Sequence, residues 1–285
     1  MAHCAALLSL ATLFMASACT AQTPNCREFQ RRPVVFVHGS GLSPDSWREM
    51  IAAFRERGYA AHQLHAVRLT PADGANARAA ERFIQPAVRE LLSVVGRRAE
   101  AAGCRPPRKV DIVSHSMGAV SSRWYIARID ATTVRNWVGI APANHGTDAL
   151  CGHAGDGNRE MCPAFASTSA QSAIQVTLNG STDNRVDETP YGFGRDSPDR
   201  PPVAPTDAAG VYYWTIRIDP DEWIRPASSA LLDGAGGRTI HGLPATGVRE
   251  SSPGNFLWPT GVAHDDLPRH PQLIELVIRL LETDR

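Results

Sequence analysis

The chain has 285 residues, of which 43% are hydrophobic and 20% charged, a composition that is typical of a folded globular protein. The 29 Lys and Arg residues balance the 29 Asp and Glu residues, so the formal net charge is zero. This balance argues against the basic surface that binds nucleic acid or an acidic membrane, and we expect no nucleic-acid partner.

The N-terminus carries an apolar run over residues 5–18, which is too short to span a bilayer and is followed by small residues. We expect residues 1–18 to be a signal peptide, although this segment has no Lys or Arg before the apolar run. Residues 16–19, Ala-Ser-Ala-Cys, also resemble a weak lipobox. The protein is therefore predicted to be secreted or periplasmic, with a lipoprotein anchored through Cys19 as the alternative.

Residues 34–37, Val-Val-Phe-Val, predict a buried strand, and a glycine-rich loop follows at 38–41. Loops of this kind present backbone N–H groups to a substrate, and their small residues keep the approach clear. Ser43 and Pro44 then have the residue types of an N-cap and a first helical position. The helix they open is predicted to end near Gly58.

A further strand is predicted over 59–64, a polar loop over 70–77, and a helix over 78–102 with a kink at Pro86. Residues 110–126 follow, which predict a strand, a sharp turn and a helix with Ser116 at the corner. This pattern is typical of a nucleophile elbow, in which a strained turn lifts a serine hydroxyl above the edge of a sheet.

The rest of the chain predicts strands over 136–141, 211–218 and 237–243, and a closing helix over 271–281. The stretch 148–210 between two of these strands shows no strong periodicity apart from a short helix within 164–178. Strands that alternate with helices predict an α/β protein with a mostly parallel sheet covered by helices on both faces.

Five polar residues are predicted to follow strand ends and so to gather at one edge of the sheet: His38, Ser116, Asn144, Asp221 and His264. A serine nucleophile needs a histidine base, and that base needs an acid to orient it. His264 lies between the last strand and the last helix, with His241 as the alternative base. Asp219, Asp221 and Glu222 follow one strand, and their positions alone do not distinguish which is the acid.

Five segments in this order resemble the class 2 bacterial lipases, with kinship to secreted polyhydroxyalkanoate depolymerases: Val-His-Gly-Ser-Gly at 37–41, Val-Ser-His-Ser-Met-Gly at 113–118, Asn-His-Gly-Thr at 144–147, Asp-Glu-Trp-Ile-Arg-Pro at 221–226 and Gly-Val-Ala-His at 261–264. The resemblance covers roughly residues 33–147 and 211–282. The chain departs from the family at Ser114, where Ala or Gly is usual, and in the insertion after Thr147.

The resemblance implies an α/β-hydrolase fold in a domain of residues 26–285. It also implies Ser116 as nucleophile, Asp221 as acid and His264 as base. The N–H groups of Ser40 and Met117 would form the oxyanion hole. The chemistry this implies is acyl transfer from an ester, which needs no metal or organic cofactor.

A secreted lipase or carboxylesterase is therefore the predicted function, acting on a lipid or polyester substrate. We expect a monomer that makes at most transient contact with a lipid surface. A polyhydroxyalkanoate depolymerase is the alternative enzyme, and a catalytically silent binding protein of the same fold is the alternative of a different class. The insertion 148–210 begins beside the predicted site and ends at the strand that delivers Asp221. It is therefore predicted to lie over that site as a cap, with a surface excursion as the alternative.

Four cysteines remain after the predicted signal and Cys19, an even number that suits disulfides in an exported chain. Cys26 and Cys104 precede strands that would be parallel neighbours in this fold, by seven and six residues. We therefore predict that Cys26 pairs with Cys104 and that Cys151 pairs with Cys162.

Overall fold

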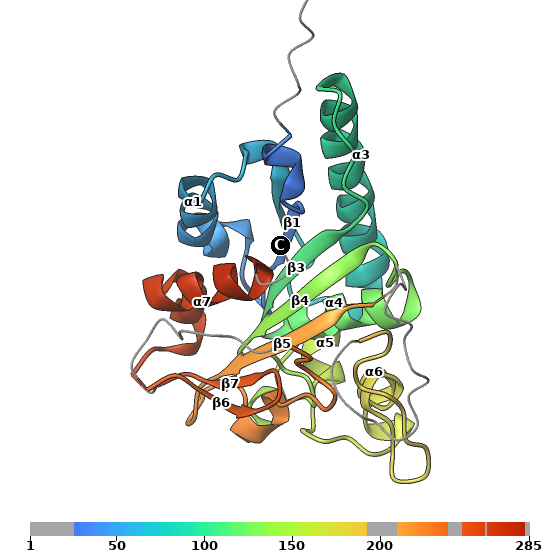
Figure 1. Cartoon of the computed structure of the whole chain (residues 1–285). Coiled ribbons are helices and arrows are strands. Elements are labelled where there is room, and N and C mark those ends of the chain that lie inside the picture. The colour runs from blue at the N-terminus through green and yellow to red at the C-terminus, as the bar shows by residue number, and fades with distance from the viewer. Residues whose placement is uncertain (1–25, 193–209, 239–246, 260, 283–285) are drawn as a thin grey trace, which may run out of the picture.

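The computed structural model describes residues 26–192, 210–238, 247–259 and 261–282. The predicted signal peptide and Cys19 lie outside these ranges. The described chain is built on a seven-stranded sheet with the order β2-β1-β3-β4-β5-β7-β6, in which β6 and β7 are antiparallel and all other neighbours are parallel (Figure 1). The strands are β1 (Val34–Val37), β2 (Leu64–Val67), β3 (Val110–His115), β4 (Val134–Ile140), β5 (Tyr212–Arg217), β6 (Arg249–Ser252) and β7 (Asn255–Leu257).

Helices cover both faces of this sheet, with α1 and α7 on one side and α3 on the other (Figure 1). The fold class predicted from the sequence, a mostly parallel α/β sheet between helices, is confirmed. The helices are α1 (Arg48–Glu56), α2 (Asn76–Ala79), α3 (Gln85–Ala101), α4 (Met117–Arg128), α5 (Asp156–Glu160), α6 (Ser169–Asn179) and α7 (Pro271–Glu282).

Strand β1 shows how the two faces are filled. Its side chains alternate, so that Val34 and Phe36 join the core beneath α1 and α7, whereas Val35 and Val37 join the core beneath α3 and α4. All four are fully buried, and Phe36 meets the ring of Phe54 from α1 edge-on at a centroid distance of 5.5 Å. A central strand that is apolar on both faces is what a doubly covered parallel sheet requires.

Two predicted elements are shifted in the structure. The second strand is β2, Leu64–Val67, and not 59–64, because Gln63 caps a short 3-10 turn by accepting a hydrogen bond from the Ala60 N–H. The long helix predicted over 78–102 is divided into α2, a π-helical turn at Ala80–Ile84, and α3. Pro86 lies in the first turn of α3, where its missing N–H is tolerated, so the irregularity precedes the proline.

The C-terminal side of the sheet contains a hairpin that the sequence analysis missed. Strands β6 and β7 pair across Pro253 and Gly254, and β7 adds to β5 in parallel. These strands are short and all four residues of β6 are exposed, so the sequence has little hydrophobic periodicity here to detect. Most of the strand predicted at 237–243 lies outside the described residues, and Gly237 and Arg238 are not in a strand.

Both predicted disulfides are confirmed. Cys26 and Cys104 are joined with their Cα atoms 5.6 Å apart, and Cys151 and Cys162 with theirs 5.2 Å apart. The first tethers the start of the described domain to the turn before β3. The second closes a short loop that contains α5.

The described part of the insertion, residues 148–192, contains two helices and packs on the body of the domain. Helix α6 begins at Ser169 after a capping box between Thr168 and Gln171, later than the predicted start at 164. Its Ile174 and Leu178 are buried in the core. This segment therefore does not pack only on itself, as the surface-excursion alternative supposed.

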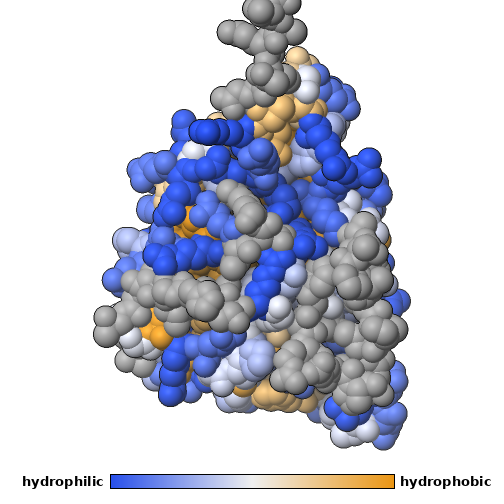
Figure 2. All heavy atoms as spheres, in the orientation of Figure 1, coloured by the Kyte–Doolittle hydropathy of each residue, from blue (hydrophilic) through white to orange (hydrophobic). Residues whose placement is uncertain are grey.

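The face of the molecule seen in Figure 2 is mostly hydrophilic, with small hydrophobic patches between polar regions. The large hydrophobic side chains that are exposed in the described ranges are Phe165, Val186, Tyr191 and Trp223. Among the helices that the structure describes, none combines the length and the apolar character needed to cross a membrane.

Candidate active site

Ser116 occupies a strained corner between β3 and α4. Its φ of 54° and ψ of −126° are unusual for a residue with a side chain, and such strain is found at nucleophile elbows. A Cβ at Gly118 would lie 2.5 Å from the carbonyl oxygens of Val37 and His38, so only glycine allows α4 to approach β1 this closely. Ser114, the departure from the family pattern, is buried and donates its hydroxyl to Val138 O at 3.2 Å.

Asp221 and His264 form a buried pair. The Oδ2 of Asp221 lies 3.0 Å from Nδ1 of His264, and both side chains are almost fully inaccessible. The other carboxylate oxygen, Oδ1, accepts the backbone N–H groups of Trp223 and Ile224 at 2.8 and 2.9 Å. The backbone N–H of His264 donates to Glu222 at 2.6 Å. Asp221 is thus held rigidly, and it fixes the imidazole so that Nδ1 carries a proton and Nε2 is free to accept one.

The structure separates the three acids that sequence position left open. Asp219 is more than half exposed and pairs with Arg217. Glu222 accepts a hydrogen bond from the backbone N–H of His264, whereas Asp221 accepts one from its imidazole. The alternative base His241 lies outside the described residues.

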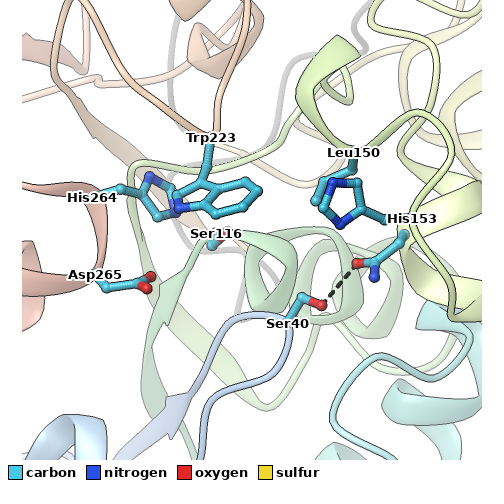
Figure 3. Close-up of a pocket in the computed structure, with 8 residues that line it drawn as sticks. Ser40, Ser116, Leu150, His153, Trp223, His264 and Asp265 are labelled. Carbon is cyan, nitrogen blue, oxygen red and sulfur yellow. Dashed lines mark hydrogen bonds between the residues drawn. The ribbon is translucent and has the colours of Figure 1, made fainter.

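Ser116, His264 and Ser40 meet at a pocket of about 160 Å³ (Figure 3). The Nε2 of His264 has no hydrogen-bond partner among the described residues. Trp223, which also lines this pocket, is 38% exposed. The pocket is lined by Ser40, Ser116, Leu150, His153, Asn158, Trp223, His264 and Asp265.

The loop after β1 is shaped by His38. Its Nε2 accepts the Leu69 N–H at 3.2 Å, so Nδ1 carries the proton and donates to Gly39 O at 2.9 Å. Burial holds the pKa of His38 below its ordinary value, which keeps the ring in this neutral form. A Cβ at Gly39 would lie 2.8 Å from Cβ of Ser116, which brings the backbone of this loop against the elbow. Met117 opens α4, where first-turn N–H groups have no partner within the helix.

His115 lies directly beneath His264. Its Nε2 donates to the backbone oxygen of His264 at 3.1 Å, and the two rings are 4.6 Å apart. Burial, and then the charge of His264, hold the pKa of His115 well below its ordinary value. His115 is therefore neutral at physiological pH and does not oppose a positive charge on His264.

Three potential metal ligands converge at this point, since His115, His264 and Asp265 offer atoms within 4.8 Å of one another. His264 already binds Asp221 through Nδ1, and His115 binds the backbone through Nε2. Asp265 is exposed. These contacts explain the cluster as part of the Ser116 site, and they do not by themselves indicate a cation.

Sequence reasoning missed several pocket residues. Leu150, His153 and Asn158 come from the insertion, where no motif marks them, and Asp265 is one of many exposed carboxylates. Trp223 is the variable position inside the Asp-Glu-x-Ile-x-Pro segment, so its place in the pocket follows from that of Asp221. The closeness of Trp223 to Asp221 in the sequence was the signal that could have placed Trp223 in the pocket.

The family model for lipase (class 2) matches residues 31–182, which is 152 of the 285 residues. The chain belongs to the class 2 lipase family. Lipases are carboxylic ester hydrolases, and this is the class of enzyme to which the protein belongs. The match includes the first part of the insertion, up to residue 182, and contains both Ser40 and Ser116.

Two solved structures share the lipase's fold at low sequence identity. The mature form of the lipase BlEst2 from Bacillus licheniformis is 16% identical, with a TM-score of 0.55 over 88% of this chain and 92% of that one. The lin2722 gene product of Listeria innocua is 12% identical, with a TM-score of 0.50 over 89% and 94%. These similarities support the α/β-hydrolase fold and say nothing of substrate.

Proposed function

We propose that this lipase is a secreted serine hydrolase in which Ser116 is the nucleophile, His264 the base and Asp221 the orienting acid. The observation that carries the proposal is the arrangement of His264. One ring nitrogen is bound to a rigid carboxylate, and the other has no hydrogen-bond partner in the described part of the chain and lies at the pocket that Ser116 lines. This is the arrangement that lets an imidazole take a proton from a serine hydroxyl.

The reaction proceeds through an acyl-enzyme. His264 Nε2 takes the Ser116 proton as the hydroxyl oxygen attacks the ester carbonyl, and the tetrahedral intermediate collapses when His264 returns the proton to the leaving alcohol. Water then repeats the sequence against the acyl-serine and releases the acid. Asp221 orients the ring throughout and stabilises its positive charge.

The oxyanion hole is assigned to the backbone N–H groups of Ser40 and Met117. Ser40 follows a glycine that touches the elbow, and Met117 is the first residue of α4. Each such donor lowers the barrier by about 3 kcal/mol because the charge it meets develops only in the transition state.

The substrate is proposed to be a lipid or related acyl ester. Leu150 and Trp223 supply apolar surface to the pocket, while Ser40, His153, Asn158 and Asp265 make much of its lining polar. A pocket of this size and polarity favours short acyl chains over long ones. A polyhydroxyalkanoate depolymerase is the second candidate, favoured by the partly exposed Trp223 ring, which can lie on a polymer surface.

The insertion 148–210 is proposed to act as a cap that shapes this pocket. Leu150, His153 and Asn158 belong to it and line the pocket. The rings of Trp223 and His153 meet in a T-shaped arrangement with their centroids 5.9 Å apart, which links the insertion to the opposite wall of the pocket.

Export is proposed because two disulfides stabilise proteins in oxidising compartments. Cleavage before Cys19 leaves a free protein, whereas lipidation of Cys19 leaves an anchored one. Mass spectrometry of the mature N-terminus distinguishes these two outcomes.

A panel of esters tests the proposed function. We expect soluble short-chain esters to be hydrolysed faster than emulsified long-chain triacylglycerols or polyhydroxyalkanoate films, and Ser116→Ala to lose activity on all of them by several orders of magnitude with the fold intact. Preference for the polymer film would favour the depolymerase. Activity that survives in Ser116→Ala would contradict the mechanism.

A further inference from the structure

Both residues of the proposed oxyanion hole are contacted by the short helix α5 of the insertion. The hydroxyl of Ser40 donates to Oδ1 of Asn158 at 2.7 Å (Figure 3). The next residue back, Gly157, packs on Met117 so closely that an added Cβ would lie 2.6 Å from the Met117 sulfur. A single turn of the insertion therefore contacts the side chains of both residues whose backbone N–H groups are assigned to the oxyanion hole.

We propose that Asn158 is a positioning residue for the oxyanion hole, which it holds in place through the hydroxyl of Ser40. This inference rests on the proposed function, since it assumes that the Ser40 N–H stabilises the intermediate. Asn158 is 7% exposed, and its amide orientation is fixed because Nδ2 donates to Ala154 O in its own loop. The side-chain oxygen must therefore face Ser40.

The backbone around Ser40 explains why such a brace is needed. In a trans peptide, the Gly39 oxygen and the Ser40 N–H point in opposite directions, and His38 holds the Gly39 oxygen. On the other side of Ser40, Gly41 has a φ of +70°, and no heavy atom of the described residues lies within 4 Å of where its Cβ would be. The Leu42 N–H closes the turn by donating to Gly39 O at 3.3 Å, and the bond to Asn158 restrains the Ser40 side chain between these points.

Helix α5 is itself anchored, although a helix of five residues is unstable alone. The Gly157 N–H donates to Asp73 O at 2.9 Å, and Glu160 accepts both the backbone and side-chain N–H of Asn76 at 2.7 and 2.8 Å. The Cys151–Cys162 disulfide closes the loop around it. Asn158 is thus presented to Ser40 from a fixed base.

Loss of the brace lets the Ser40 N–H turn away from the oxyanion, which forms only after the substrate has bound. Complete removal of an oxyanion donor typically costs about 10² to 10³ in kcat, so loosening one is expected to cost about tenfold. We expect Asn158→Ala to lower kcat on a soluble p-nitrophenyl ester by about tenfold, with KM changed by less than about twofold. The inhibition constant of a trifluoromethyl ketone, which forms an oxyanion on Ser116, should rise by about the same factor.

A double-mutant cycle with Ser40→Ala separates positioning from a general structural role. Ser40→Ala removes the hydroxyl but retains the backbone N–H group. If Asn158 acts through that hydroxyl, each single change costs about tenfold and the double variant falls no further, whereas independent effects would multiply to about a hundredfold.

Arg159→Ala is the matched control, because Arg159 is on the same helix, is exposed and pairs only with Asp156 among the contacts seen. It should change neither kcat nor the inhibition constant. If Asn158→Ala does not fold, Ser40→Ala decides, and an unchanged kcat and inhibition constant in Ser40→Ala would overturn the inference. A double variant in which the two losses of kcat multiply to about a hundredfold would overturn it too. Ester hydrolysis that survives in Ser116→Ala would instead refute the proposed function.

Discussion

The two nitrogens of His264 have opposite surroundings, and this asymmetry defines its proposed role. Nδ1 is bound to Asp221 at 3.0 Å, and Nε2, at the pocket, has no hydrogen-bond partner within the ranges that the structure describes. The ring beneath it, His115, is kept neutral by burial, which holds its pKa well below the ordinary value. A positive charge on His264 is therefore stabilised by the Asp221 carboxylate and is not opposed by the neutral His115 ring.

The assignment of the acid predicts a clear contrast between two neighbouring aspartates. Asp221→Asn removes the charge and allows the amide to favour the wrong imidazole tautomer, so we expect kcat to fall by about 10³-fold or more. Asp219→Asn should stay within about twofold of the wild type, because Asp219 is exposed and reaches only Arg217. Steady-state kinetics on a soluble ester measure both, and greater damage from Asp219→Asn would refute the assignment.

The sequence indicated the residues that motifs place at strand ends, and it could not indicate those that reach the site through tertiary packing. Ser116 was identifiable because Ser114 and Gly118 leave room for the turn around it. Asp221 could be separated from Asp219 only by resemblance, since both follow β5. Asn158 was not identifiable, because its role depends on how α5 folds back against the loop after β1.

Helix α5 and the Cys151–Cys162 disulfide connect the insertion to the active site. The loop closed by Cys151 and Cys162 contacts Ser40 and Met117, whereas the Cys26–Cys104 bridge joins the segment before β1 to the turn before β3. The two bridges should therefore contribute differently to stability and to catalysis. Sequence spacing predicted both pairings, but only the packing of α5 links one of them to the site.

Replacing each cystine with a pair of serines tests this difference. Cys26→Ser with Cys104→Ser opens a span of 78 residues and should cost about 4.5 kcal/mol of unfolding free energy by the loop-closure relation, while kcat stays unchanged. Cys151→Ser with Cys162→Ser opens a span of 11 and should cost less, about 3 kcal/mol, while kcat falls by about tenfold. Urea unfolding measures the loss of unfolding free energy. Ester kinetics, at urea concentrations below the unfolding midpoint of each variant, measure the change in kcat. Equal kcat in the two variants would show that the Cys151–Cys162 bridge is not needed to hold the α5 loop at the site.

At the scale of the whole molecule, one edge of the sheet gathers groups from distant parts of the chain. The loop after β1, the elbow after β3, and the loops after β5 and β7 bring Ser40, Ser116, Asp221 and His264 together. Alternating strands and helices predicted this gathering, because parallel strands end at a common edge. The antiparallel β6–β7 hairpin was not predicted, yet it precedes the loop that carries His264.

Covalent labelling with a fluorophosphonate tests most directly whether Ser116 is an activated nucleophile. Intact-mass spectrometry and peptide mapping should show one adduct per chain, on the peptide that contains Ser116, in protein that hydrolyses esters. Labelling should be absent in Ser116→Ala and strongly slowed in Asp221→Asn. An adduct on another serine, or ester hydrolysis by protein that the probe does not label, would contradict the mechanism.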